Sequence, residues 1–197
     1  MPAGPLADDC WVAAASKRPE SAASEAERAA LCANVRAPRQ VGECYFSVAE
    51  LMGAPALCRE AAPFADDCAL HVVSIAFARS EAPTEAFAAE QIQRAGLSPA
   101  DPRPWSAYFR EVLGRVRPLD RSACGQVAPD HREACEQTTI SLFSDRLNQA
   151  RDRRQFTCVE GAPQPPWPDL VAFQPDAVFE QVMAARVDLC TPRDVPR

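Results

Sequence analysis

The sequence predicts an all-α protein in which about seven helices stack as helical hairpins stapled by disulfides, with no sheet. Three observations support this fold class. Apolar residues recur at the three- and four-residue spacing of amphipathic helices along most of the 197-residue chain. The alternation of β-branched residues that is typical of strands is absent. Nine cysteines bound short segments that separate the helical patterns, and these segments repeat.

The N-terminal part of the chain predicts a tail and two helices. Residues 1–9 are expected to be loose, and a short helix should begin near Asp8 and carry Cys10. Ser24 and Glu27 have the spacing of a capping box, in which each side chain accepts a hydrogen bond from the other residue's backbone amide. We therefore expect an Ala-rich helix to follow.

Three further helices are expected in the repeating part of the chain. Gly42 precedes a predicted helix over residues 43–52. A short second helix is expected over 56–62. Asp66 is a suitable N-cap for a third helix, over 67–79, which is apolar on nearly every side.

The second half of the chain contains an insertion and a further copy of the repeat. Residues 80–120 interrupt the cysteine pattern and form an insertion between repeat units. Helices are predicted over residues 83–95, 105–116, 130–153 and 175–189. Residues 191–197 are expected to be loose. We expect the whole chain, residues 1–197, to form a single domain.

The cysteines are expected to pair within the repeated segments. Each segment places a cysteine at the end of one helix and another near the start of the next, and about ten residues can bring their ends within disulfide reach. Closing such a loop stabilises the fold by roughly 2–3 kcal/mol in the chain-entropy model. Eight cysteines allow many connectivities, and the repeat favours Cys32–Cys44, Cys58–Cys68 and Cys124–Cys135, with Cys158–Cys190 by elimination.

Cys10 is the cysteine without a partner in this scheme. It belongs to a half copy of the repeat, because LADDC at 6–10 matches FADDC at 64–68. The half copy predicts a further cysteine upstream of the printed chain, and the lipid-bearing cysteine of a lipoprotein is one candidate.

The repeated segments resemble a known group of proteins. GECYFSVAE at 42–50, FADDCALHVVSIA at 64–76 and LADDCWVAAA at 6–15 are similar to the cysteine-rich helical repeats of secreted proteins and lipoproteins of bacteria and archaea. The resemblance covers about half of the chain. It implies a helical, extracytoplasmic architecture, and it implies no activity.

Composition bounds the setting and the partners. The net charge of −6 lacks the basic excess expected of a nucleic-acid-binding protein. Nine cysteines favour an oxidising compartment: the periplasm, an outer-membrane lipoprotein or a secreted protein. No apolar run is long enough for a transmembrane helix. The N-terminus has no signal-peptide pattern, so we expect a mature domain whose signal sequence lies outside the printed chain.

Metal binding is the alternative hypothesis. Cys68 and His71 lie on one helical turn, and His131 lies four residues before Cys135. In a reduced, cytosolic protein these side chains could bind a metal ion. The alternative function is therefore a cytosolic, thiol-rich, metal-binding helical protein. The opposing interpretation places both histidines on ordinary helix surfaces.

Enzymatic motifs are missing from the sequence. It contains no G-x-S-x-G, no C-x-x-C and no Gly-rich phosphate loop, so we expect neither catalysis nor a cofactor. The remaining hypothesis is a binding or scaffold module for a protein or peptide partner. Candidate contact residues are Trp105 and Tyr108 in the insertion and Trp167 in the segment QPPWP, although a Trp at helical spacing is more often part of a core.

Overall fold

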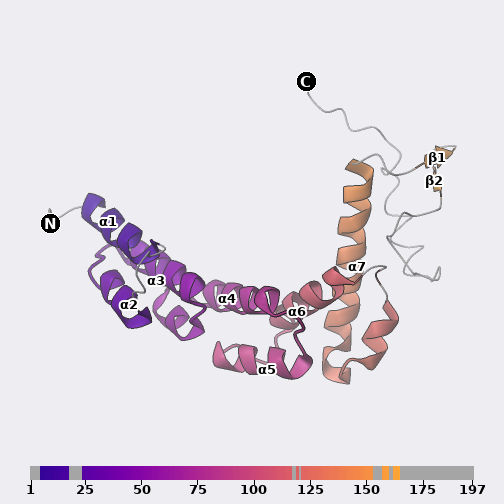
Figure 1. Cartoon of the computed structure of the whole chain (residues 1–197), viewed down its shortest axis with the longest axis horizontal. Helices are drawn as coiled ribbons and strands as arrows, with labels where there is room; N and C mark the ends of the chain where they lie inside the picture. Colours follow the sequence, from indigo (N-terminus) through magenta and orange to yellow (C-terminus); the bar gives the residue numbers. More distant parts are fainter. Residues whose placement is uncertain are drawn as a thin grey trace. The chain divides into compact units, whose positions relative to one another are not determined.

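The structure, a computed structural model, describes residues 5–17, 24–116, 119, 121–152, 157–159 and 162–164 (Figure 1). Its elements, in chain order, are α1 (Pro5–Ser16), α2 (Glu25–Cys32), α3 (Pro38–Met52), the 3-10 helix η1 (Pro55–Glu60), α4 (Ala65–Arg79), α5 (Glu85–Arg94), α6 (Pro102–Arg115), the 3-10 helix η2 (Arg121–Gln126), α7 (Pro129–Asp152), β1 (Thr157–Val159) and β2 (Ala162–Gln164). No helix in the described ranges is long and apolar enough to cross a membrane.

The all-α fold class is confirmed, with one local exception. β1 and β2 pair antiparallel as a hairpin of three residues on each side, whereas the sequence predicts no sheet. Alternation over three residues is too short to be recognised as a strand in the sequence. Residues 5–9 belong to α1, so that part of the expected loose tail is helical. The predicted helix over 175–189 and the tail over 191–197 lie outside the described residues.

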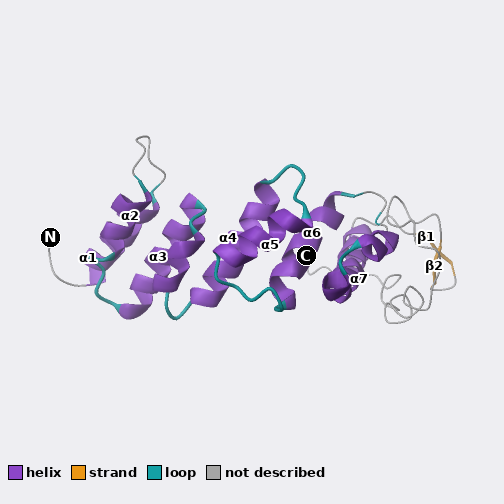
Figure 2. Cartoon of the chain, turned by 90° about the horizontal axis from the view of Figure 1, so that it is seen from below, coloured by secondary structure: helices purple, strands orange, loops and turns teal. Residues whose placement is uncertain are grey.

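Contacts group the chain into two compact units, Met1–Pro104 and Trp105–Arg197. In the first unit α1, α3 and α4 lie side by side, with α2 packed against α1 and α3 and with η1 packed against α3 and α4 (Figure 2). The first unit has two apolar clusters, one around Cys32 and Cys44 and one around Cys58 and Cys68. Cysteine sulfur therefore contributes to the centre of each cluster, and Ala and Val fill most of the remaining space.

Three disulfides are present in the described part of the chain, and they join the pairs that the repeat predicts. Each bond connects a short helix or its end to the long helix that follows: α2 to α3, η1 to α4 and η2 to α7. The bonds are Cys32–Cys44, Cys58–Cys68 and Cys124–Cys135, with Cα–Cα separations of 5.6, 5.4 and 5.7 Å. The predicted Cys158–Cys190 bond lies outside the residues whose side chains the structure describes.

Helix α3 begins earlier than the sequence predicts. It starts at Pro38, and proline suits the first turn of a helix because the missing N–H would have no intrahelical partner there. Gly42 is therefore inside the helix and not before it. A Cβ at this position would lie 2.3 Å from the carbonyl oxygen of Ala62, so only glycine permits this close approach of two backbones.

The starts of three other helices differ in detail from the prediction. Helix α4 begins at Ala65, which places Asp66 within the first turn and leaves Phe64 as the N-cap. Helix α5 is capped by the side chain of Thr84, and α6 begins at Pro102. The Asp101 carboxylate accepts a hydrogen bond from the Arg103 amide at 2.9 Å, as an N-cap does.

The capping box at the start of α2 is confirmed. Ser24 Oγ accepts from the Glu27 amide at 3.2 Å, and the Ser24 amide donates to Glu27 Oε2 at 2.7 Å. The backbone hydrogen bond from Ser24 lowers the pKa of the Glu27 carboxyl. Both the local sequence signal and the observed geometry therefore define this helix start.

Other helix ends are satisfied by side chains from far along the chain. The N-cap of α3, Ala37, has no capping side chain of its own. The buried carboxylate of Asp8 on α1 accepts from the amides of Arg36 at 3.2 Å and Ala37 at 3.1 Å instead. Asp8 thus stabilises the entrance of α3 and joins α1 to it.

Two buried arginines bind helix C-termini in a similar way. Arg28 on α2 donates through Nη1 to the carbonyl of Ala15, near the end of α1. In the second unit, Arg146 on α7 donates through Nη2 to three carbonyls at the end of α6: those of Leu113, Gly114 and Val116, at 3.3, 3.1 and 3.0 Å. Carbonyls at a helix C-terminus lack intrahelical donors, so a guanidinium is a suitable partner for them.

Candidate functional site

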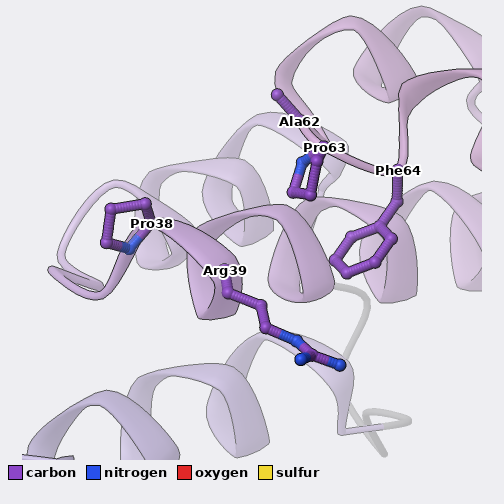
Figure 3. Close-up of a pocket in the computed structure, with 5 residues that line it drawn as sticks. All are labelled: Pro38, Arg39, Ala62, Pro63 and Phe64. Carbon is purple, nitrogen blue, oxygen red and sulfur yellow. The ribbon is translucent and has the colours of Figure 1, made fainter.

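A hollow of about 540 Å³ opens on the first unit, between the start of α3 and the connection from η1 to α4 (Figure 3). Five residues line it: Pro38, Arg39, Ala62, Pro63 and Phe64. Its volume lies within the range of about 300–1,000 Å³ that is usual for ligand sites in proteins. We therefore consider this hollow as the candidate functional site.

Disulfide-closed segments supply all of the lining residues. Pro38 and Arg39 lie within the segment that Cys32–Cys44 closes. The other three residues, from Ala62 to Phe64, lie within the segment that Cys58–Cys68 closes. The close approach of Gly42 to the Ala62 carbonyl brings the two segments together. Both walls are therefore held in place covalently, and little chain entropy remains to be lost when a ligand binds.

The lining is apolar apart from one cation. Two proline rings, an alanine methyl group and the half-buried ring of Phe64 form most of the surface. The guanidinium carbon of Arg39 lies 5.9 Å from the centre of the Phe64 ring, which is within cation–π range. The hollow can therefore offer a flat apolar contact beside a positively charged group.

Arg39 is only partly engaged by its neighbours. Its Nε donates to Glu43 Oε1 at 3.0 Å, one helical turn further along α3. The Arg39 side chain is 79% exposed, and an exposed ion pair of this kind contributes at most about 1 kcal/mol. Within the described residues, Nη1 and Nη2 of Arg39 form no hydrogen bond. These two nitrogens remain available to a ligand.

The aromatic contact residues proposed from the sequence are not on the surface. Trp105 and Tyr108 are only 3% and 5% exposed. They pack with Phe109, and the Trp105 ring stacks on His131 with centroids 3.5 Å apart. Positions 105, 108 and 109 share one face of α6, and that face is buried, so they are core residues. Trp167 lies outside the described residues.

The metal-binding alternative is wrong for its cysteine. Cys68 is bonded to Cys58, so it cannot supply a thiolate. His71 is exposed, with Nε2 3.5 Å from Glu50 Oε1, and His131 is stacked on Trp105. Where the structure describes the chain, no group of three or more His, Cys, Asp or Glu side chains is placed to hold a metal ion.

Cys10 has the status that the repeat predicts for it within the described chain: it is exposed and forms no disulfide there. The three intramolecular disulfides indicate a non-reducing, extracytoplasmic setting.

Sequence analysis did not identify the hollow because it treated the cysteine-bounded segments as connectors. A local signal was available: one segment carries a Pro–Arg pair at 38–39 and the next carries Pro–Phe at 63–64. Rings and a cation in consecutive closed loops are typical of a binding surface more than of a plain connection. Comparison with protein families, curated proteins and solved structures finds no match to this chain.

Proposed function

We propose that this protein is a non-enzymatic binding module of a bacterial envelope or secreted protein, and that its hollow holds a peptide segment of a partner protein. One observation carries this proposal: every residue that lines the hollow belongs to a segment closed by a disulfide. A site built in this way is organised before its ligand arrives, and such preorganisation improves affinity.

The chemistry of the lining supports binding more than catalysis. Among its five residues, the only ionisable side chain is the guanidinium of Arg39, which stays protonated and cannot act as a general base. Proline and phenylalanine rings instead present rigid surfaces, which lose little entropy when another chain packs on them.

A displayed library of random peptides tests this proposal with a defined set of ligands. The oxidised full-length protein is immobilised, and enriched peptides are then measured on the wild type, on Phe64→Ala and on Met52→Ala. Met52 is an exposed apolar residue of α3 that does not line the hollow, so it is the matched control. We expect enriched peptides to bind the wild type and Met52→Ala equally, and Phe64→Ala at least about tenfold more weakly.

Two results would contradict the proposal. One is that no peptide is enriched on the oxidised protein. The other is that the enriched peptides bind Phe64→Ala as tightly as the wild type, which would place the contact elsewhere on the molecule.

A further inference from the structure

The state of Arg39 points to the chemistry of the ligand. A guanidinium presents its donors as a planar fork, and a pair of parallel N–H groups matches the two oxygens of a carboxylate. In Arg39 the Nε donor is already occupied by Glu43, and this bond orients the group. Nη1 and Nη2 together form the remaining free edge of the fork, which is the edge suited to two-point carboxylate binding.

The position of this edge links it to the apolar wall. The Arg39 guanidinium lies over the Phe64 ring, and Pro63 precedes Phe64 in the same closed segment (Figure 3). A ligand that reaches the guanidinium must therefore pass the apolar surface of the hollow. A carboxylate alone would leave this surface in water, whereas a ring beside the carboxylate would cover it.

Charge favours an acidic ligand at this point. The chain carries a net charge of −6, yet the lining of the hollow contributes one cation and no anion. Glu43 neutralises Arg39 only through an exposed contact, with 47% of its own side chain accessible, so an incoming carboxylate does not have to break a buried pair.

We infer that the hollow binds a carboxylate next to a proline: Nη1 and Nη2 of Arg39 donate to the two carboxylate oxygens, and the proline ring packs against Pro63 and Phe64. This inference rests on the proposed function and specifies its ligand. The carboxylate can come from a Glu or Asp side chain or from the C-terminus of a partner chain, since both offer the same pair of oxygens.

Fluorescein-labelled peptides test the inference by anisotropy on the oxidised full-length protein. The probes are GSPPEGS and GSPPQGS, both amidated, and GSQPP with either a free or an amidated C-terminus. We expect GSPPEGS to bind about tenfold more tightly than GSPPQGS, because a charge-assisted, two-point hydrogen bond replaces a neutral one. A preference for free GSQPP over its amide would identify a chain terminus as a second source of the carboxylate.

Variants of Arg39 and of a matched residue provide the controls. Arg39→Gln should reduce the Glu-to-Gln preference to about one, and Arg39→Lys should keep only part of it, because an ammonium lacks the planar fork. Arg94 is also an exposed arginine paired with a glutamate one turn away, at 3.6 Å from Glu90, and it does not line the hollow. Arg94→Gln should leave the preference unchanged.

The outcomes separate this inference from the proposed function. Equal binding of GSPPEGS and GSPPQGS to the wild type, or a preference that survives in Arg39→Gln, would overturn the carboxylate inference. If library peptides without a carboxylate still depend on Phe64, the inference fails and the binding function stands. If no peptide depends on Phe64, the binding function itself fails.

Discussion

Arg28 in the first unit and Arg146 in the second occupy comparable positions with different hydrogen bonding. Both are buried, and both donate to carbonyls at the C-terminal end of an earlier helix. Arg146 has three acceptors on α6, whereas Arg28 has one on α1. Among the described residues, the Nε of Arg28 has no hydrogen-bond partner. A buried cation stabilises a fold only when its donors are satisfied, so the two arginines should differ in value.

The difference reflects what else joins each helix to its neighbours. In the second unit the disulfide connects η2 to α7 and does not reach α6. Side chains must therefore join α6 to α7, and Arg146 is assisted by Arg110, which pairs with Asp145 at 2.9 Å. In the first unit α1 is additionally joined to α3 by Asp8. Arg28 is thus one contact among several, and Arg146 is the main one.

The largest effect should come from Arg146→Met. Three carbonyls at the end of α6 would lose their donor, and we expect a loss of about 3 kcal/mol, at roughly 1 kcal/mol for each unmade bond. Hydrogen–deuterium exchange on the oxidised protein should show faster exchange in α6 and unchanged protection in α3, which is the internal control. Unchanged protection of α6 would mean that other contacts hold the helix.

A smaller effect is expected from Asp8→Ala. This change removes the only side chain that accepts from the amides of Arg36 and Ala37 in the described part of the chain, and losing a cap costs about 1–2 kcal/mol. The neighbouring Asp9, which contacts Gln40 at 2.8 Å, provides the control, because Asp9→Ala leaves the cap intact. Exchange at the start of α3 should accelerate in the first variant only. Equal acceleration in both variants would show that general negative charge, not capping, is responsible.

Arg28→Met should change stability by less than about 1 kcal/mol. The variant loses one hydrogen bond, but it also removes a buried charge with an unsatisfied Nε, and these effects oppose each other. Urea unfolding, measured beside Arg146→Met under the same conditions, gives the direct comparison. A loss as large as that of Arg146→Met would show that the two arginines are equivalent after all.

The smallest effect, and one that depends on pH, is expected from Asp101→Asn at the start of α6. Hydrogen bonds from the Arg103 side chain and then from its backbone lower the pKa of the Asp101 carboxyl. The carboxylate therefore stabilises the fold fully above its unfolded pKa of about 3.9, and this contribution is lost as the pH falls through the lower folded pKa. Asn does not titrate, so the urea midpoint of the variant should fall less between pH 6 and pH 3. Parallel falls would contradict this assignment.

Features that depend on neighbouring residues could be predicted from the sequence. The Ser24–Glu27 capping box and three disulfides between successive cysteines belong to this class, because their partners lie within about a dozen positions of each other. The stripe of apolar residues on α6 was also evident, although whether its aromatic rings face a core or a partner depends on packing.

Features that depend on distant residues could not be predicted. Gly42 was assigned to a helix boundary because its contact with Ala62, twenty positions away, has no trace in the local pattern. Asp8 was likewise assigned only to the start of its own helix, whereas its carboxylate caps the following long helix. The hollow requires both of its cysteine-closed segments to be in place, so neither segment alone indicates it.

The order of the disulfides along the chain has a consequence for oxidative folding. Cys32 bonds to Cys44, Cys58 to Cys68 and Cys124 to Cys135, so each cysteine pairs with its immediate successor and no bond encloses another. A chain oxidised as it emerges from its N-terminal end can therefore form each native bond as soon as the next thiol appears, with no later exchange. Cys10 is the exception, because the first thiol that follows it is Cys32. Replacing Cys10 with serine leaves a chain whose thiols, from Cys32 to Cys135, can be oxidised correctly in order of synthesis, without an isomerase.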